Sequence, residues 1–176
     1  CVACAKDDRS GVTVWVTVQP QRYFVERIGG DWVSAEVLVR PGQSPEMYAP
    51  SAAQIARVAG AAAYFGIGMP IEGVLFKRMQ SAMSGIRMVQ TGGEIAAQHD
   101  HSGHGHHGHN CAEVDPHIWL DPVRMVAVVE QMRDVFIELE PSAADLFVRN
   151  ADGLIAELRA LDQDLRIQLA PYAGRT

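Results

Sequence analysis

Short apolar runs alternate with amphipathic segments through the first half of the chain. The runs are rich in β-branched residues, and the first is apolar at almost every position, which is typical of a strand buried on both faces. Strands are predicted over residues 12–18, 33–39, 62–67 and 87–90. Helices are predicted between them, over residues 20–30, 51–60 and 71–82. This alternation predicts an α/β fold with a parallel sheet flanked by helices, and ligands in the loops at the carboxyl ends of the strands.

Apolar residues recur at helical spacing through the last third of the chain. Asp121 is a good N-cap residue and Pro122 a good first helical residue, so a helix is predicted from there to Leu139. A second helix is predicted over residues 141–170. Its length of about 45 Å exceeds the diameter of about 26 Å expected for a 100-residue domain. We therefore expect this long helix to reach beyond the first lobe toward something else.

Composition narrows the class of protein. Of the 176 residues 48% are hydrophobic and 20% are charged, which suffices for a core and excludes a disordered tail. The most apolar stretch, residues 49–71, is interrupted by Arg57 and Pro70, so no membrane span is predicted. The net charge is −6 and lysine and arginine form no stripe. Nucleic acid is therefore not expected as a partner.

Six of the seven histidines fall within residues 99–109, among glycines and a serine. Nothing apolar anchors this segment, and residues 98–112 are predicted to form a disordered loop. Imidazole suits Zn²⁺, Ni²⁺ and Cu²⁺, and several interchangeable imidazoles predict metal capture of low affinity with fast exchange. An inert linker is the alternative. We call these residues the histidine cluster: His99, His101, His104, His106, His107 and His109.

His117 stands in a different setting, between Pro116 and Pro122, which restrict the backbone and hold the side chain still. Asp115 and Asp121 are near enough in sequence to accept an imidazole N–H, which would fix the tautomer of the ring. From spacing alone, a lone histidine beside a helix start is more often structural than a ligand.

Glu46 lies in a turn-rich loop, residues 40–50, that follows the second predicted strand. An α/β fold places its ligands at this position. Taken alone, however, Glu46 is a surface carboxylate.

The three cysteines are Cys1, Cys4 and Cys111, an odd number that leaves at least one thiol unpaired or modified. Residues 1–11 are predicted to be a flexible segment that looks like the start of a bacterial lipoprotein, with the lipid on Cys1 or Cys4. The alternative is that these cysteines are incidental. Whether Cys111 pairs stays open.

Several motifs follow one another in a familiar order: Val-Thr-Val, Tyr-Phe-Val-Glu-Arg-Ile-Gly-Gly-Asp, Val-Arg-Pro-Gly-Gln-Ser-Pro, Tyr-Phe-Gly-Ile-Gly, the histidine cluster and Asp-Pro-His-Ile-Trp-Leu-Asp-Pro. Over nearly its whole length the chain resembles the zinc and manganese solute-binding proteins of bacterial ABC transporters, and in particular the ZnuA-like members that carry a histidine-rich loop. The resemblance implies two α/β lobes joined by a long helix, with the metal between them. Residues 12–140 would then be the first lobe, residues 141–170 the interlobe helix and residues 171–176 the start of the second lobe.

The resemblance also implies the metal ligands. The first lobe of the family usually supplies two imidazoles, and His117 matches one of those positions. The other is typically histidine, and here it is Glu46. A carboxylate can ligate zinc through oxygen, but it makes the site harder, which favours Mn²⁺ or Fe²⁺ as alternatives to Zn²⁺. The remaining ligands would come from the second lobe.

The function implied is capture of Zn²⁺ outside the inner membrane, in the periplasm or on the outer face of the membrane. A monomer would deliver the ion to a membrane permease of an ABC transporter. The alternatives are a manganese or iron protein of the same family, a periplasmic zinc buffer and an adhesin-type lipoprotein. A metalloenzyme is not expected, because the chain has no His-Glu-x-x-His motif and no obvious general base beside His117.

Overall fold

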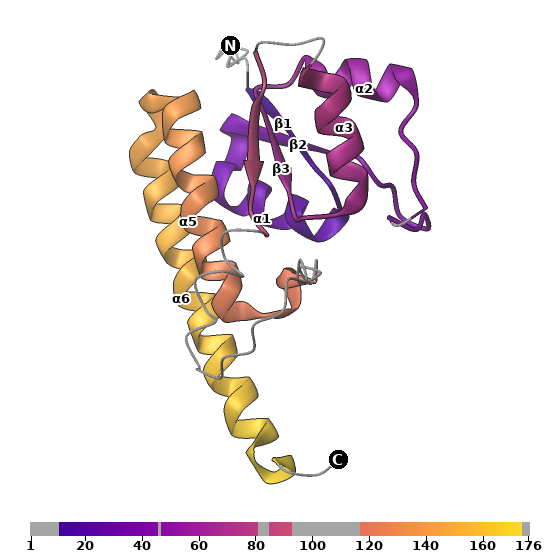
Figure 1. Ribbon diagram of the computed structural model, residues 1–176. Helices are drawn as coiled ribbons and strands as arrows, with labels where there is room; N and C mark the ends of the chain where they lie inside the picture. Colours follow the sequence, from indigo (N-terminus) through magenta and orange to yellow (C-terminus); the bar gives the residue numbers. More distant parts are fainter. Residues whose placement is uncertain (1–10, 46, 81–84, 93–116, 174–176) are drawn as a thin grey trace, which may run out of the picture.

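The predicted strands form one parallel sheet, and helices cover both of its faces (Figure 1). The structure, a computed structural model, describes residues 11–45, 47–80, 85–92 and 117–173. Its strands are β1 (Val12–Val16), β2 (Val33–Val37), β3 (Ala63–Gly66) and β4 (Arg87–Gln90), in the order β2-β1-β3-β4. Neighbouring strands are parallel throughout. The fold class predicted from the alternation is therefore confirmed.

Two adjacent residues of β3 contact the two helical layers. Tyr64 packs edge-on against Phe76 of α3 (Pro70–Gln80), with ring centroids 5.8 Å apart. Phe65 packs in the same way against Phe136 of α5 (Pro122–Leu139), also at 5.8 Å. Successive side chains of a strand point to opposite faces, so α3 and α5 lie on opposite sides of the sheet. The core therefore occupies both faces, as the apolar strands predicted.

The other two helices of the first half begin and end at the predicted signals. In α1 (Gln19–Gly29) the chain leaves the helix at Gly30, whose φ of 54° lies in the left-handed region that favours glycine. In α2 (Ala52–Ala59) the Ser51 hydroxyl accepts the N–H of Gln54 at 3.2 Å and so caps the helix. Helix α1 packs against α5, whereas α2 contacts α3 on the other layer.

The end of β1 comes two residues earlier than predicted, at Val16 instead of residue 18. The N–H groups of Thr17 and Val18 both donate to the side-chain oxygen of Gln21, at 2.9 and 3.1 Å. A buried amide of α1 therefore accepts these two N–H groups at the end of the sheet, whereas the backbone oxygen of Thr17 accepts the N–H of Val39 at 3.0 Å. Strands β2 and β3 are also shorter than predicted, whereas β4 has the predicted bounds.

The long helix is α6 (Ala144–Leu169), which begins after a 3₁₀ turn at Pro141–Ala143 and is followed by another at Ala170–Tyr172. The residues that it buries all lie between Phe147 and Leu158, and the helix packs against α5 and α1. Its second half extends past the sheet (Figure 1). None of the helices in the described part of the chain is long and apolar enough to cross a membrane.

Candidate metal-binding site

A pocket of about 400 Å³ lies at the carboxyl ends of the first three strands. Its wall comes from residues 18–20, which follow β1 and begin α1, and from the loops after β2 (residues 39–45) and β3 (Met69), together with His117 and Trp119. We call it the strand-end pocket. Loops at this edge are where a parallel α/β sheet is expected to hold a ligand.

His117 reaches the pocket from the segment that leads into α5. Its backbone oxygen accepts the N–H of Leu120 at 3.0 Å and so opens a short 3₁₀ turn, Ile118–Leu120. Ile118 is buried and anchors this turn, whereas the side chain of His117 is exposed. The imidazole packs against the Trp119 ring, with centroids 5.1 Å apart. This arrangement holds the ring in place while leaving it accessible, as a metal ligand requires.

Asp121 fixes the start of α5 beside this turn. Its Oδ1 accepts the N–H groups of Val123 and Arg124 at 2.9 and 3.2 Å, as predicted for an N-cap residue. Its Oδ2 lies 3.4 Å from Nε of Arg124. The contacts described for this carboxylate are thus with the first turn of α5. Asp115, the other acceptor expected for the imidazole, lies outside the described residues.

The loop after β2 turns back toward the pocket. The N–H of Gln43 donates to the backbone oxygen of Arg40 at 3.1 Å, and Gly42 has a φ of 85°, which favours glycine. Ser44 and Pro45 line the pocket. Glu46, the next residue and the expected second ligand, lies outside the described residues.

The histidine cluster also lies outside the described residues. Among the residues that are described, no three histidine, cysteine, aspartate or glutamate side chains gather as a metal site would require. The structure therefore describes one of the two expected core ligands, His117, and the pocket that it lines.

Sequence reasoning missed a buried polar network behind the pocket. The Glu72 side chain, in the first turn of α3, is only 1% exposed. Its Oε1 accepts the Thr17 hydroxyl at 2.5 Å and the Ile67 N–H at 2.8 Å. Its Oε2 accepts the Gly68 N–H at 2.9 Å and the Gln90 amide at 3.2 Å. One carboxylate thus joins segments that follow β1 and β3 to the end of β4.

Tyr64 extends this network. Its hydroxyl lies 2.9 Å from Oγ1 of Thr17. Burial, and next the negative charge of Glu72, raise the pKa of Tyr64 well above its usual value, and the hydrogen bond with Thr17 opposes them. The phenol therefore stays protonated and can donate to Thr17, which in turn donates to Glu72. The signal that could have revealed the network is a polar side chain, Glu72, within an otherwise apolar helix start.

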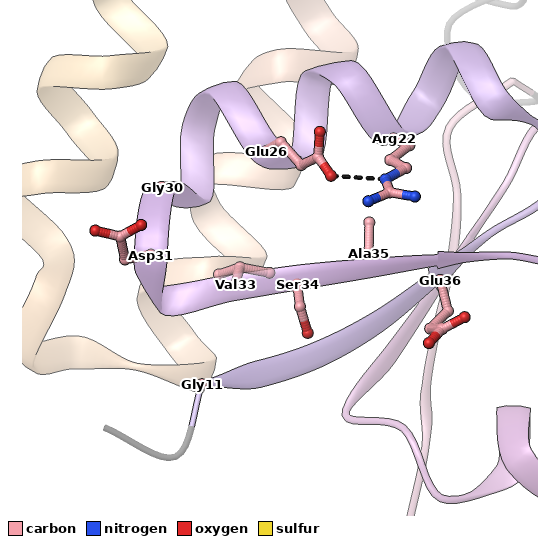
Figure 2. A pocket seen from close by; sticks show the side chains of 9 residues that line it. All are labelled: Gly11, Arg22, Glu26, Gly30, Asp31, Val33, Ser34, Ala35 and Glu36. Atoms are coloured by element: carbon pink, nitrogen blue, oxygen red, sulfur yellow. Dashed lines mark hydrogen bonds and ion pairs between the residues drawn. The ribbon is translucent and has the colours of Figure 1, made fainter. Parts of the chain in front are cut away.

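A second hollow, of about 530 Å³, lies between α1 and β2, near Gly11 at the start of β1 (Figure 2). Glu26 points toward Arg22, and the two form an ion pair at 2.6 Å. Asp31 and Glu36 point in other directions, so the three carboxylates do not converge on one point (Figure 2). This hollow does not have the geometry of a metal site.

Comparisons with known proteins point to one family. The family model described as "Zinc-uptake complex component A periplasmic" (ZnuA) matches residues 14–176. The zinc-binding lipoprotein AdcA of Streptococcus pneumoniae (strain ATCC BAA-334 / TIGR4) is 29% identical over 174 residues, which cover 92% of this chain and 34% of AdcA. The manganese-binding lipoprotein MntA of Halalkalibacterium halodurans is 26% identical over 172 residues, covering 97% of this chain and 54% of MntA.

The fold is also that of a solved relative. A crystal structure of ZnuA superposes with a TM-score of 0.76 and 29% sequence identity, covering 94% of this chain and 61% of the ZnuA chain. The chain thus spans about a third to three fifths of the length of these relatives.

Proposed function

The chain belongs to the family of periplasmic zinc-uptake complex components A, and from this membership we propose that it captures Zn²⁺ outside the inner membrane for delivery to the permease of an ABC transporter. The observation that carries the proposal is an exposed His117 in a pocket at the carboxyl edge of the sheet. AdcA, which the chain resembles over 92% of its length, is named a zinc-binding lipoprotein. The proposed role is binding and release of an ion, not catalysis.

His117 and Glu46 are proposed as the core ligands from this lobe. A neutral imidazole and a carboxylate oxygen both suit Zn²⁺, at about 2.0–2.2 Å from the ion. Ser44 and Pro45 line the same pocket as His117, which supports a place for Glu46 at its rim. Because protonated imidazole cannot ligate a metal, binding is expected to weaken in acid.

The remaining ligands are proposed to come from a second lobe. In this arrangement residues 12–140 form the first lobe, residues 141–170 the interlobe helix, and residues 171–176 lead into the second lobe. Apolar side chains spaced four residues apart on the second half of α6 support it, because Leu161, Leu165 and Leu169 are 48%, 37% and 60% exposed. A row of exposed apolar side chains is typical of a surface that another domain covers.

The histidine cluster is proposed to collect Zn²⁺ with low affinity, and residues 98–112 to form its loop. A place in the periplasm or on the outer face of the membrane, with a lipid on Cys1 or Cys4, is proposed because AdcA and MntA are both named lipoproteins. The protein is proposed to act as a monomer. Copurification with an ABC permease is the expected result. A zinc buffer or an adhesin would be purified without a permease.

Manganese is the second candidate for the ion. MntA is named a manganese-binding lipoprotein. Glu46 offers a hard oxygen donor, which suits Mn²⁺ better than it suits Zn²⁺. Most protein sites bind Zn²⁺ more tightly than Mn²⁺. Preference for Mn²⁺ in a competition at equal concentrations would therefore put manganese in the place of zinc in the proposal.

The test of the site is a zinc titration followed by the indole N–H signal of Trp119 in NMR spectra. The chain has three tryptophans, and Trp119→Phe identifies the signal whose ring packs 5.1 Å from His117. Zinc should shift this signal. His117→Ala should lower the zinc affinity obtained from the titration by more than the roughly 10–100-fold that loss of an outer-shell partner costs.

The matched control removes residues 98–112 and with them the histidine cluster. This deletion should lower the number of zinc ions bound in calorimetry while leaving the Trp119 shift unchanged. If the deletion abolished the Trp119 shift and His117→Ala did not, the assigned roles would be wrong.

A further inference from the structure

Glu72 carries a buried carboxylate that forms no ion pair with any of the residues that the structure describes. Its four hydrogen bonds with described residues all come from donors, namely a hydroxyl, two backbone N–H groups and an amide NH₂. Such surroundings fit the carboxylate anion. A buried anion without a cationic partner is unusual, because taking a charge out of water is costly.

Two of these hydrogen bonds place the carboxylate directly behind the strand-end pocket. Thr17, which donates its hydroxyl to Oε1 at 2.5 Å, precedes Val18 in the pocket wall. Gly68, which donates its N–H to Oε2 at 2.9 Å, precedes Met69 in the same wall. On two separate loops the carboxylate is therefore one residue away from the pocket.

The surroundings of Glu72 screen its charge only weakly. Tyr64, Ile67 and Leu75 are each 0% exposed, so the medium around the network contains little water. Buried charges are screened far less by solvent and salt than exposed ones. The cation on the pocket wall, Arg40, is exposed and hence well screened.

We propose that Glu72 makes the strand-end pocket selective for divalent cations. Its negative charge, behind the pocket wall, attracts the ion that His117 ligates. The inference rests on the proposed function and deepens it. Glu72 is not a ligand in this role, since its oxygens are occupied by protein donors. Coulomb attraction is proportional to the charge of the bound ion, so a dication gains twice as much as a monovalent ion and an anion is repelled.

A purely structural role is the competing explanation, since Glu72 also ties together the loops that form the wall. Glu72→Gln does not separate the two roles, because it removes the charge and also turns an amide nitrogen toward the Gly68 N–H. The double variant Glu72→Gln/Gln90→Glu does separate them. It places a carboxylate on residue 90, whose side-chain Nε2 lies 3.2 Å from Oε2 of Glu72 in the wild type, but leaves the contact with Gly68 disturbed.

Thr17→Val gives the opposite control. It keeps the charge of Glu72 and the shape of residue 17, and it removes two hydrogen bonds of the network, those of the Thr17 hydroxyl with Glu72 and with Tyr64. If Glu72 acts only by holding the loops, this loss should perturb the pocket and lower its zinc affinity. If Glu72 acts through its charge, the affinity should not change, because the charge remains in place.

Zinc affinity is measured on the full chain from the Trp119 indole signal, and folding is checked by urea unfolding. Glu72→Gln should weaken zinc binding about ten-fold, the size expected for a unit charge acting on a dication from beyond contact distance. The double variant should restore the affinity to within about three-fold of the wild type. Thr17→Val should lower stability and leave the affinity unchanged.

Failure of rescue in the double variant, or a loss of affinity in Thr17→Val equal to that in Glu72→Gln, would show that Glu72 acts only by holding the loops. Unchanged zinc binding in Glu72→Gln would also overturn the inference. If Glu72→Gln does not fold, the other two variants still decide, because each must retain wild-type affinity. His117→Ala tests the proposed function separately, since its failure to weaken binding would refute the site whatever Glu72 does.

Discussion

Gly66 ends β3 directly beneath the Glu72 network, and the absence of a side chain there has a physical reason. A Cβ on this residue would lie 2.5 Å from Oε2 of Glu72 and 2.9 Å from the side chain of Gln90. Both of those groups are held by hydrogen bonds and cannot move without breaking them. Oε1 of Gln90 already lacks a partner within the described part of the chain. The carboxylate can therefore occupy its position at the end of the sheet only because residue 66 has no side chain.

Gly66→Ala should consequently destabilise the protein, by about 1–3 kcal/mol, as overpacking in a core does. The measurement is the free energy of unfolding from urea denaturation. Gly73→Ala is the matched control, because Gly73 lies in α3 with nothing within 4 Å of its added Cβ. That change should stabilise the helix by about 0.5–1 kcal/mol. Equal effects of the two substitutions would contradict the close packing described at Gly66.

At the scale of elements, α5 depends on the residue that caps it. Asp121 accepts two backbone N–H groups of the first turn, and the turn that carries His117 precedes it immediately. The cap therefore stabilises the helix and also fixes the direction from which His117 enters the pocket.

Asp121→Ala should cost about 1 kcal/mol of unfolding free energy, the usual effect of losing an N-cap side chain. Asp121→Asn should retain wild-type stability, because asparagine caps as well as aspartate. Asp152→Ala, at an exposed position of α6, is the control for loss of a carboxylate and should change stability by less than about 0.5 kcal/mol. Wild-type stability in Asp121→Ala would mean that the cap contributes nothing. A lower free energy of unfolding in Asp121→Asn would mean that the charge matters more than the hydrogen bonds.

The elements themselves could be predicted because their signals are local. The apolar strands, the Ser51 and Asp121 caps and Gly30 each act on the next few residues, and the structure has the corresponding strands and helices. The end of β1 could not be predicted, since it depends on a side chain in the following helix. The Glu72 network could not be predicted either, because it joins positions 17, 67, 68 and 90, and each polar residue alone looks like a surface residue.

The candidate site was predicted by a different route. Spacing alone favours a structural role for His117, and only the resemblance to solute-binding proteins makes it a proposed ligand. The structure adds that the loops after the first three strands meet at this residue. Glu46 and the histidine cluster stay predictions, because they lie outside the described residues.

At the scale of the whole molecule, α6 is divided into two parts with different roles. Leu154 in the first part is 2% exposed and packs in the core of the lobe, and Arg27 of α1 forms a two-point ion pair with Glu157 at 2.7 and 3.0 Å. Leu169 in the second part is 60% exposed. The helix thus belongs to the lobe at one end and offers an apolar face at the other.

Leu154→Ala should therefore cost about 2–5 kcal/mol of unfolding free energy, as truncation of a buried leucine does. Leu169→Ala should cost less than about 1 kcal/mol in this chain, because its side chain contributes little to the core of the lobe. Hydrogen exchange offers a second measurement, since amides in the second half of α6 should exchange faster than those in the first half. If Leu169→Ala were as costly as Leu154→Ala, the second half of α6 would be packed on this lobe, and the apolar face would not be available to a second one.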